Sequence, residues 1–340
     1  MIRRGAQALG AVLAICVACA ACQRTGRLSE TEQVLWTTCT ITLYDHASRQ
    51  SLDACFARLR EIHARMSVGV PGSELDKIDA AAGKSPVHVT DDVLRVTLKA
   101  LQLAQLSDGL FDPTVGPLIS VWKINQEHPE IPSARDITAA RALVNWKDVS
   151  VDEASKSIFL KRPGMKLDLG GLVKGYAADE AVRILSARGV RSAIIDLGGD
   201  IFAMGHGQTG QPWRIGVQNP DTERGSYLGI AEVTNSSVVT SGVYEHFFIK
   251  NGKRYHHLMD TRTGYPVDNG LESVTVITGS SMDADGFGLA LFCMGKKAGL
   301  TLGEKLGLGV IMVDVNHKVY ATPETKRYFT LTDPGFTYGN

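Results

Sequence analysis

Helix and strand patterns follow one another in no regular order along this chain, and this order constrains its fold more than any other feature. Apolar residues recur at helical spacing in residues 52–66 and 90–106. Short patterns typical of strands occupy residues 35–44, 157–160, 166–169, 192–197, 213–217 and 273–278. A doubly wound parallel sheet requires strand and helix to alternate. The order therefore predicts an α+β fold with mixed, largely antiparallel sheets flanked by helices.

The size and charge of the chain exclude several classes of protein. Its 340 residues are 44% hydrophobic, which is enough for an ample core without disulfide bonds. The formal charge is zero, with 36 Lys and Arg against 36 Asp and Glu. Since no basic excess is present to neutralise phosphates, nucleic acid is excluded as a partner. Cys39, Cys55 and Cys293 have no metal-binding spacing and are predicted to be buried thiols.

The first 33 residues are predicted to lie outside the folded domain. Two arginines precede an apolar run from Ala11 to Ala21, a pattern typical of a secretory signal peptide over residues 1–22. Cys22 stands where a lipoprotein signal carries its acylated cysteine, so we favour a lipid anchor on a bacterial membrane, facing the periplasm. Ordinary cleavage and an uncleaved anchor are the alternatives. Residues 23–33 are polar and are predicted to form a short tether.

The segment from Lys166 to Arg188 suits a phosphate-binding turn. A predicted strand passes through Asp168, Gly170 and Gly171 form the turn, and a helix follows. Glycine amides at a helix N-terminus can approach a phosphate closely. Lys174 lies in the first helical turn, where a cation opposes the helix dipole unless an anion is close by. A plain tight turn with a solvated lysine is the alternative.

A carboxylate near the start of a helix predicted over residues 283–294 is a candidate metal ligand. Ser280 and Asp283 fit a capping box, which predicts where this helix begins. Asp285 follows in the first turn and offers one of the oxygens that Mg²⁺ prefers. Four positions later, on the same face, Leu289 offers none. Two acidic residues that serve only the helix dipole are the alternative.

The stretch from Val238 to Pro266 combines hydroxyl groups, histidines and a carboxylate. Asn251 and Gly252 predict a type I′ hairpin turn within it. On the return strand His256 and His257 point to opposite faces, so only one of them can face a site. A lone histidine on a strand is more often structural than catalytic. The neighbouring Thr, Ser and Asp residues favour a functional role, and both roles stay open.

The loop from Gly109 to Leu118 is predicted to be rigid. Two Xaa-Pro steps, at Pro113 and Pro117, fix an extended and kinked path. A rigid loop with backbone groups at fixed angles suits one wall of a nucleotide site. A structural crossover between helix and core is the alternative.

Together these segments resemble one family, the FAD:protein FMN transferases, also called the ApbE family. The resemblance covers about residues 35–308 and rests on the order and spacing of several short pieces, none of which is specific alone. The pieces are SEL (73–75), FDPTVGPL (111–118), LDLGGLVKGYAAD (167–179), DLGGDI (196–201), TSGVYEHF (240–247), HHLMDTRTGYP (256–266), and SVTVI with AD (273–277 and 284–285). The resemblance implies an ApbE-like domain over residues 34–340.

The resemblance also implies an activity and a set of site residues. Members of the family look like Mg²⁺-dependent enzymes that split FAD, attach FMN to a threonine of a membrane-associated flavoprotein and release AMP. Contacts to FAD then fall on Leu110, Phe111, Asp112, Asp168, Lys174 and Met259. Metal contacts fall on Gly171, through its carbonyl, and on Asp285, which is also a catalytic candidate. His257 is the second catalytic candidate, as an acid/base or phosphate contact.

Three departures from the family pattern bear on this activity. Leu289 stands where the family has a threonine metal ligand, and Gly69 where it has a tyrosine that stacks on the flavin nucleotide. Leu35-Trp36-Thr37 stands in place of Met-Gly-Thr. Loss of an aromatic stack is worth about 0.5–1.5 kcal/mol of FAD affinity, unless Trp36 fills that space. Two alternatives therefore remain: a non-catalytic periplasmic lipoprotein that binds or delivers FAD, and an FAD pyrophosphatase that releases FMN and AMP.

Overall fold

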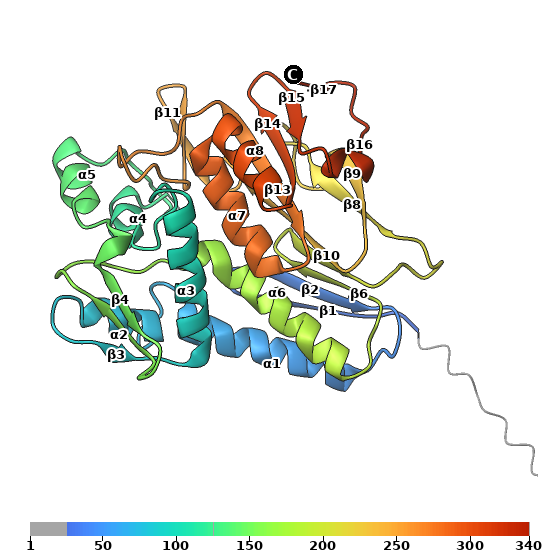
Figure 1. Cartoon of the computed structure of the whole chain (residues 1–340), viewed down its shortest axis with the longest axis horizontal. Coiled ribbons are helices and arrows are strands. Elements are labelled where there is room, and N and C mark those ends of the chain that lie inside the picture. The colour runs from blue at the N-terminus through green and yellow to red at the C-terminus, as the bar shows by residue number, and fades with distance from the viewer. Residues whose placement is uncertain (1–25, 125, 340) are drawn as a thin grey trace, which may run out of the picture.

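The computed structural model describes residues 26–124 and 126–339, which fold around one large central sheet (Figure 1). The predicted signal peptide, with Cys22, and residues 23–25 of the predicted tether lie outside the described residues. In the described part of the chain, no helix combines the length and apolar character needed to cross a membrane.

The central sheet has nine strands in the order β1-β2-β6-β7-β10-β13-β14-β15-β17. Its neighbouring strands pair antiparallel, except for the parallel pair β15 and β17. The strands are β1 (Leu28–Val34), β2 (Thr37–Leu43), β6 (Ala193–Leu197), β7 (Asp200–Met204), β10 (Ser236–Gly242), β13 (Leu271–Thr278), β14 (Gly309–Asp314), β15 (Lys318–Ala321) and β17 (Thr337–Tyr338). The prediction of an α+β fold with mixed, largely antiparallel sheets is confirmed.

Each face of the central sheet is covered by a different layer (Figure 1). Val239 of β10 belongs to the core under the helices, whereas its neighbour Val238 belongs to the core on the other face, as the two-residue period of a strand requires. The helices are α1 (Arg49–Met66), α3 (Asp91–Leu106), α6 (Gly170–Ala187), α7 (Ser281–Met294) and α8 (Lys296–Lys305). A second sheet covers the other face, with strands β16 (Phe329–Leu331), β9 (Tyr227–Val233) and β8 (Trp213–Gln218).

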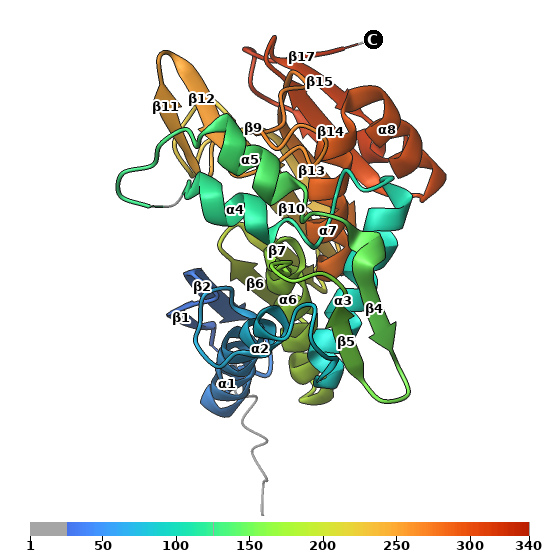
Figure 2. The same ribbon diagram turned by 90° about the vertical axis from the view of Figure 1, so that its left-hand side faces the viewer.

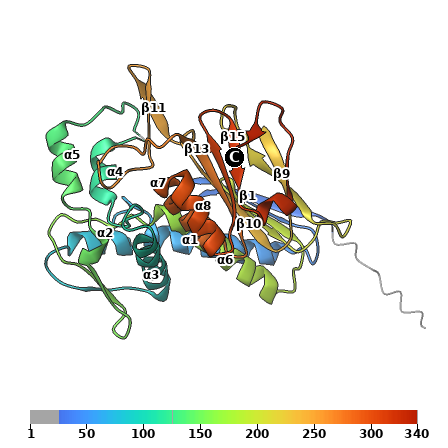
Figure 3. The same cartoon turned by 45° about the horizontal axis from the view of Figure 1, so that its top comes forward.

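The remaining elements gather at one end of the molecule (Figures 2 and 3). They are α2 (Glu74–Ala80), α4 (Gly116–Trp122), α5 (Ala134–Arg141), the sheet β3 (Val87–His88), β5 (Ser157–Leu160) and β4 (Val149–Asp152), and the hairpin β11 (Phe247–Lys250) and β12 (Lys253–His256). Two short 3-10 helices span Trp146–Asp148 and Thr325–Arg327. The hairpin packs on α4, where the rings of Trp122 and Tyr255 stack with centroids 5.6 Å apart.

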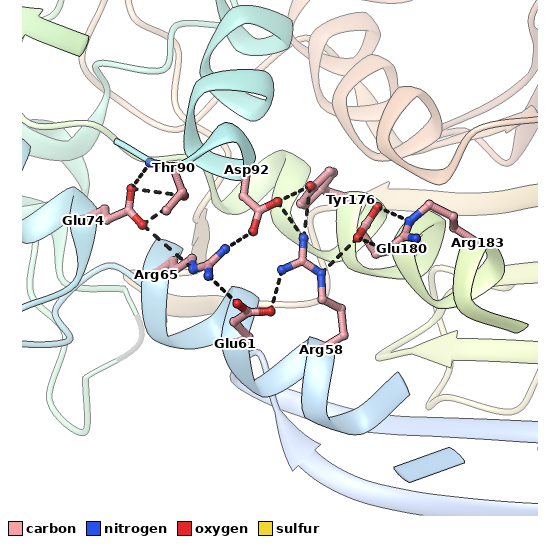
Figure 4. Close-up of polar contacts among 9 residues, drawn as sticks. All are labelled: Arg58, Glu61, Arg65, Glu74, Thr90, Asp92, Tyr176, Glu180 and Arg183. Carbon is pink, nitrogen blue, oxygen red and sulfur yellow. Dashed lines mark hydrogen bonds and ion pairs between the residues drawn. The ribbon is translucent and has the colours of Figure 1, made fainter. Parts of the chain in front are cut away.

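A network of ion pairs fastens α1, α3 and α6 to one another (Figure 4). The Arg58 guanidinium donates to Asp92 at 2.6 Å, to Glu180 at 2.9 Å and to Glu61 at 2.7 Å. The Tyr176 hydroxyl donates to the same oxygen of Asp92 at 2.6 Å. We call this group, together with Arg65, the helix-anchoring cluster. It fixes the position of α6, because Tyr176 and Glu180 both lie on that helix.

Several local predictions are confirmed. Asn251 and Gly252 have φ values of 52° and 75°, as a type I′ turn requires. The Ser280 side chain accepts a hydrogen bond from the Asp283 amide and caps α7, which begins at Ser281, two residues before the predicted start. Cys39, Cys55 and Cys293 are buried free thiols.

Two local predictions are wrong. Residues 28–33 of the predicted tether lie in β1, whose polar side chains alternate and pair with those of β2, as in the 2.8 Å contact between the Ser29 and Thr42 hydroxyls. Residues 166–169 form no strand, because their amides bond to other groups. The Asp168 amide donates to the Pro113 carbonyl at 2.8 Å, and the Leu167 amide donates to Asp79 at 2.9 Å.

Candidate active site

Helices α6 and α7 cross at a glycine, and this crossing positions the candidate site. A Cβ atom at Gly175 would lie 2.2 Å from the Ser281 carbonyl oxygen, so no larger residue fits there. Asp179, one turn further along α6, accepts from the Ser281 amide at 2.7 Å and from the Ser280 hydroxyl at 2.8 Å. These contacts fix the first turn of α7. Asp285 follows in the second turn and not in the predicted first, because the helix begins at Ser281, two residues before the predicted start.

The crossing brings one lysine and two carboxylates together at the end of the central sheet. The Lys174 ammonium donates to Asp200 and lies 3.4 Å from Oδ1 of Asp285. The other oxygen of Asp285 accepts from the Gly175 amide at 3.1 Å. The side chains of Asp200 and Asp285 are only 5% and 6% exposed. One positive and two negative groups therefore share a nearly buried space, which we call the active-site cluster.

The pKa values of this cluster reflect its excess of negative charge. Burial lowers the pKa of Lys174, but Asp200 and Asp285 outweigh that effect and hold the pKa above its usual range. Burial raises the pKa of Asp200; Lys174 opposes this shift and the charge of Asp285 adds to it. Lys174 is therefore charged at neutral pH, and the cluster favours the entry of a further cation.

The oxygen atoms around the cluster fit a magnesium ion. Among the described residues, no group of three or more His, Cys, Asp or Glu side chains could hold a metal. Mg²⁺ needs fewer, since it commonly takes one or two carboxylates and completes its shell with water and phosphate oxygens. Asp285 and Asp200 would supply the carboxylates. The Gly171 carbonyl would be a further oxygen. In a regular helix the Gly175 amide faces this carbonyl, and here that amide also donates to Asp285, which places the carbonyl close to the carboxylate.

Leu289 lies beside this candidate metal site. A Cβ atom at Gly171 would lie 2.8 Å from Cδ2 of Leu289 and 3.7 Å from Cε2 of Phe111. The leucine therefore fills, with an apolar group, the space next to the Gly171 backbone. The Phe111 side chain also lies near Gly171, at the N-terminus of α6. A predicted flavin-contact residue and a predicted metal-contact residue are therefore neighbours.

Asp112 holds this loop rigid rather than projecting from it. One of its oxygens accepts from the Thr114 amide at 2.8 Å and from the Thr114 hydroxyl at 2.6 Å. Its other oxygen accepts from the Trp146 amide at 2.9 Å. Burial raises the pKa of Asp112, although these hydrogen bonds act to lower it. Both oxygens therefore serve the loop, which presents the half-buried Leu110 and the buried Phe111.

Asp168 and Met259 lie on either side of the same loop. Oδ1 of Asp168 accepts from the Gly170 amide at 2.8 Å, at the start of α6, and burial raises the pKa of this carboxyl group. Met259 is buried beside α4. The Thr261 hydroxyl donates to the Gly109 carbonyl at 2.7 Å and ties the Met259 segment to the loop. The structure thus brings three of the predicted segments together.

The two neighbouring histidines have different surroundings. Only His256 lies on the predicted return strand, because β12 ends there and His257 follows it. His256 is buried, with Nε2 2.9 Å from the Val267 carbonyl, and is structural. Nδ1 of His257 lies 3.3 Å from the His246 carbonyl, which only accepts, so the ring proton is on Nδ1 and Nε2 is the acceptor. Burial and the neighbouring His246 lower the pKa of His257 to about 3, so its imidazole is neutral at physiological pH.

Sequence reasoning missed Asp200 and Arg224. Asp200 lies inside the piece DLGGDI, directly after a Gly-Gly turn, and this position was the available signal. Arg224 comes from the loop between β8 and β9, where its sequence context carries no signal. Its guanidinium lies 3.7 Å from the Cβ position of Gly199 and pairs with Glu245. Arg224 is therefore a second cation at the edge of the active-site cluster.

Comparisons with known proteins bear on the family and the fold of this chain. The ApbE family model matches residues 35–312. The chain is 34% identical to an FAD:protein FMN transferase of Klebsiella pneumoniae, over 87% of this chain and 92% of that one. It is 31% identical to one of Vibrio cholerae, over 80% and 82%. The solved flavin transferase ApbE from Vibrio cholerae superposes with a TM-score of 0.81 at 27% identity, covering 89% of this chain and 99% of that one. An ApbE protein from Thermotoga maritima gives 0.82 at 29%, with the same coverage.

Proposed function

Because this chain belongs to the ApbE family and is an FAD:protein FMN transferase, we propose that it uses Mg²⁺ to attach FMN to a threonine of a flavoprotein, with release of AMP. The threonine oxygen forms a bond to the phosphorus of the FMN phosphate, and the bond from that phosphorus to the bridging oxygen breaks. AMP leaves with the bridging oxygen, and the hydroxyl proton passes to a base. The observation that carries the proposal is the active-site cluster, with its unbalanced negative charge beside the N-terminus of α6.

Lys174 is the residue that binds the diphosphate in this proposal. Its pKa is raised, so it keeps its charge, and its ammonium is held by Asp200 and Asp285. Lys174 lies in the second turn of α6 and not in the predicted first, because the helix begins at Gly170. The amides at the start of that helix add partial positive charge for a phosphate. Asp285 and the Gly171 carbonyl would hold the metal, with Asp200 as a second carboxylate. When bound, Mg²⁺ supplies neutralisation of the charge that develops on the diphosphate.

His257 is the proposed base. Its imidazole is neutral, and Nε2 has no proton while Nδ1 faces the His246 carbonyl. A neutral imidazole is the form that can take a proton from an incoming hydroxyl group. The charge of a bound diphosphate would raise the pKa of His257 and so favour the transfer.

A direct assay tests the proposal. The purified full chain is incubated with FAD, Mg²⁺ and a threonine-bearing flavoprotein fragment, and the products are analysed by mass spectrometry. We expect FMN bound covalently to the fragment and one AMP for each adduct, with neither product in EDTA. A fragment with valine in place of the threonine is the matched control. Free FMN without an adduct would mean hydrolysis instead of transfer, and no adduct at any Mg²⁺ concentration would contradict the proposal.

We also propose that the protein is exported and attached to a membrane, facing the periplasm. The support is the sequence of residues 1–22, with Cys22 at the position of an acylated cysteine. Metabolic labelling with a fatty acid should mark the wild-type chain and leave Cys22→Ser unlabelled and soluble. A wild-type chain that stays unlabelled in the soluble fraction would contradict the anchor.

A further inference from the structure

The turn between β1 and β2 holds a tryptophan in a conformation that tryptophan rarely adopts. The φ values of Leu35 and Trp36 are 56° and 58°, both in the left-handed region. Glycine and asparagine are the usual residues of such a turn, because a Cβ atom is unfavourable there. The Leu35 side chain is 7% exposed and packs in the core, which accounts for its presence. The Trp36 side chain is 75% exposed, and core packing does not account for it.

This turn lies at the rim of the active site. Strand β2 pairs with β6, so the turn before β2 and the turn after β6 are at the same end of the sheet. A Cβ atom at Gly198 would lie 2.1 Å from the Thr37 hydroxyl oxygen, so the two turns are in direct contact. Asp200, which binds Lys174, follows two residues after Gly198. The turn that carries Trp36 therefore lies against the turn that leads to Asp200.

On its other side, Trp36 contacts the end of α1, which leads into the loop that lacks the tyrosine of the family pattern. Its ring contacts His63 edge-on, with centroids 5.4 Å apart. Nδ1 of His63 lies 2.8 Å from the Ser67 hydroxyl at the start of this loop. Gly69, two residues further, stands where the resemblance places a flavin-stacking tyrosine. The exposed indole thus lies at the end of α1 that leads into the Gly69 loop. A Cβ atom at Gly69 would meet no atom within 4 Å, so the space at that position is open.

We propose that Trp36 stacks on the isoalloxazine ring of FAD and supplies the aromatic surface that Gly69 does not. This inference rests on the proposed function of the same site. The indole is an electron-rich plane, and the isoalloxazine is a large, electron-poor plane, so offset stacking between them is favourable. The active-site cluster holds the diphosphate of FAD, and the adjacent rim holds its ring. The unfavourable backbone of Trp36 is retained because the side chain binds substrate.

Ligand titration of three variants tests this role. Trp36→Gly should weaken FAD and FMN binding by about 3- to 10-fold and remove the long-wavelength absorbance of stacked flavin, whereas Trp36→Phe should keep most of the affinity. Binding of ADP should stay the same in both variants. Trp36→Gly should also raise the melting temperature, since glycine suits a φ of 58°, so a loss of affinity cannot come from unfolding. Tyr227→Ala, at an exposed tyrosine on β9, is the matched control and should bind FAD as the wild type does.

The possible results separate this inference from the proposed function. If Trp36→Gly binds FAD and FMN like the wild type while the wild type forms the FMN adduct, the role of Trp36 is overturned and the transferase proposal stands. If ADP binding weakens and FMN binding does not, Trp36 contacts adenine and the flavin assignment is overturned. If the wild type neither binds FAD nor forms the adduct, both proposals fall together.

Discussion

Helix α6 takes part in two buried groups of charged residues. They differ in how fully the negative charges of their carboxylates are balanced by nearby cations and hydrogen-bond donors. In the helix-anchoring cluster, Asp92 receives hydrogen bonds from Arg58, Arg65 and Tyr176 (Figure 4). In the active-site cluster, Asp200 and Asp285 share one ammonium group, that of Lys174. Asp92 therefore receives bonds from two guanidinium groups and a hydroxyl, whereas Asp200 and Asp285 have one ammonium group between them.

The pKa values of two aspartates show the consequence of this difference. The side chains of Asp92 and Asp200 are almost equally buried, at 10% and 5% exposure. Burial acts to raise both pKa values. At Asp92 the bonds from Arg58 and Tyr176 outweigh burial, and the pKa is lowered. At Asp200 burial and Asp285 outweigh Lys174, and the pKa is raised. Burial raises the pKa of Asp200 because one lysine compensates two carboxylates, whereas stronger compensation at Asp92 outweighs burial there.

The largest expected effect comes from removing a charge of the active-site cluster. Asp285→Asn should lower the rate of FMN transfer by about 1,000-fold, because the main metal carboxylate is lost from a preorganised site. The free energy of unfolding should stay the same or rise, since the repulsion between Asp285 and Asp200 is relieved. Initial rates of AMP release and urea unfolding measure the two quantities. A strongly destabilised variant would show that Asp285 is part of the scaffold.

The same substitution in the other cluster should have the reverse outcome. Asp92→Asn should lower the free energy of unfolding by about 3 kcal/mol, because Arg58 and Arg65 lose their shared buried partner. The transfer rate per folded molecule should change little. Glu324→Gln, in the exposed pair with Arg327, is the matched control and should cost less than about 1 kcal/mol. Equal losses in both variants would remove the distinction between buried and exposed pairs.

The two clusters should also give the metal-free protein opposite responses to pH. The pKa of Asp92 is lowered in the folded state, so its contribution is present above the ordinary value of 3.8 and is lost as pH falls below it. The pKa of Asp200 is raised, so its contribution is present below 3.8 and is lost as pH rises toward about 7. Unfolding curves in EDTA from pH 3 to 8 compare the wild type with Asp92→Asn and Asp200→Asn. Parallel curves for the wild type and Asp200→Asn between pH 4 and 7 would contradict the raised pKa.

The smallest expected effect concerns the apolar side of the active-site cluster. Leu289→Thr places a hydroxyl beside the Gly171 backbone and should lower the Mg²⁺ concentration for half-maximal transfer by about fivefold, which corresponds to one added oxygen contact of about 1 kcal/mol. Leu289→Val has nearly the shape of threonine without the oxygen and is the matched control. If both variants shift the Mg²⁺ dependence alike, then space, and not the oxygen, limits metal binding.

The sequence predicted those parts of the site whose chemistry is local. The cap at Ser280 and the type I′ turn at Asn251 each depend on neighbouring residues only. The strand β1 was missed because its residues are polar, and what makes it a strand is its pairing with β2. The expected strand at residues 166–169 failed for the same reason, since no neighbouring strand was available to receive its hydrogen bonds.

The sequence by itself determined the fold class, the family and the residues of α6 and α7 that carry charge. Only the tertiary structure decided what those charges do. Asp92 and Asp200 are the same residue type, yet one pairs with two arginines and the other shares a single lysine. The tertiary structure also brought the turn at Trp36 against the turn that leads to Asp200, and its ring against His63. The physical reason is that a charge or a ring takes its role from partners distant in the chain, and packing alone brings those partners together.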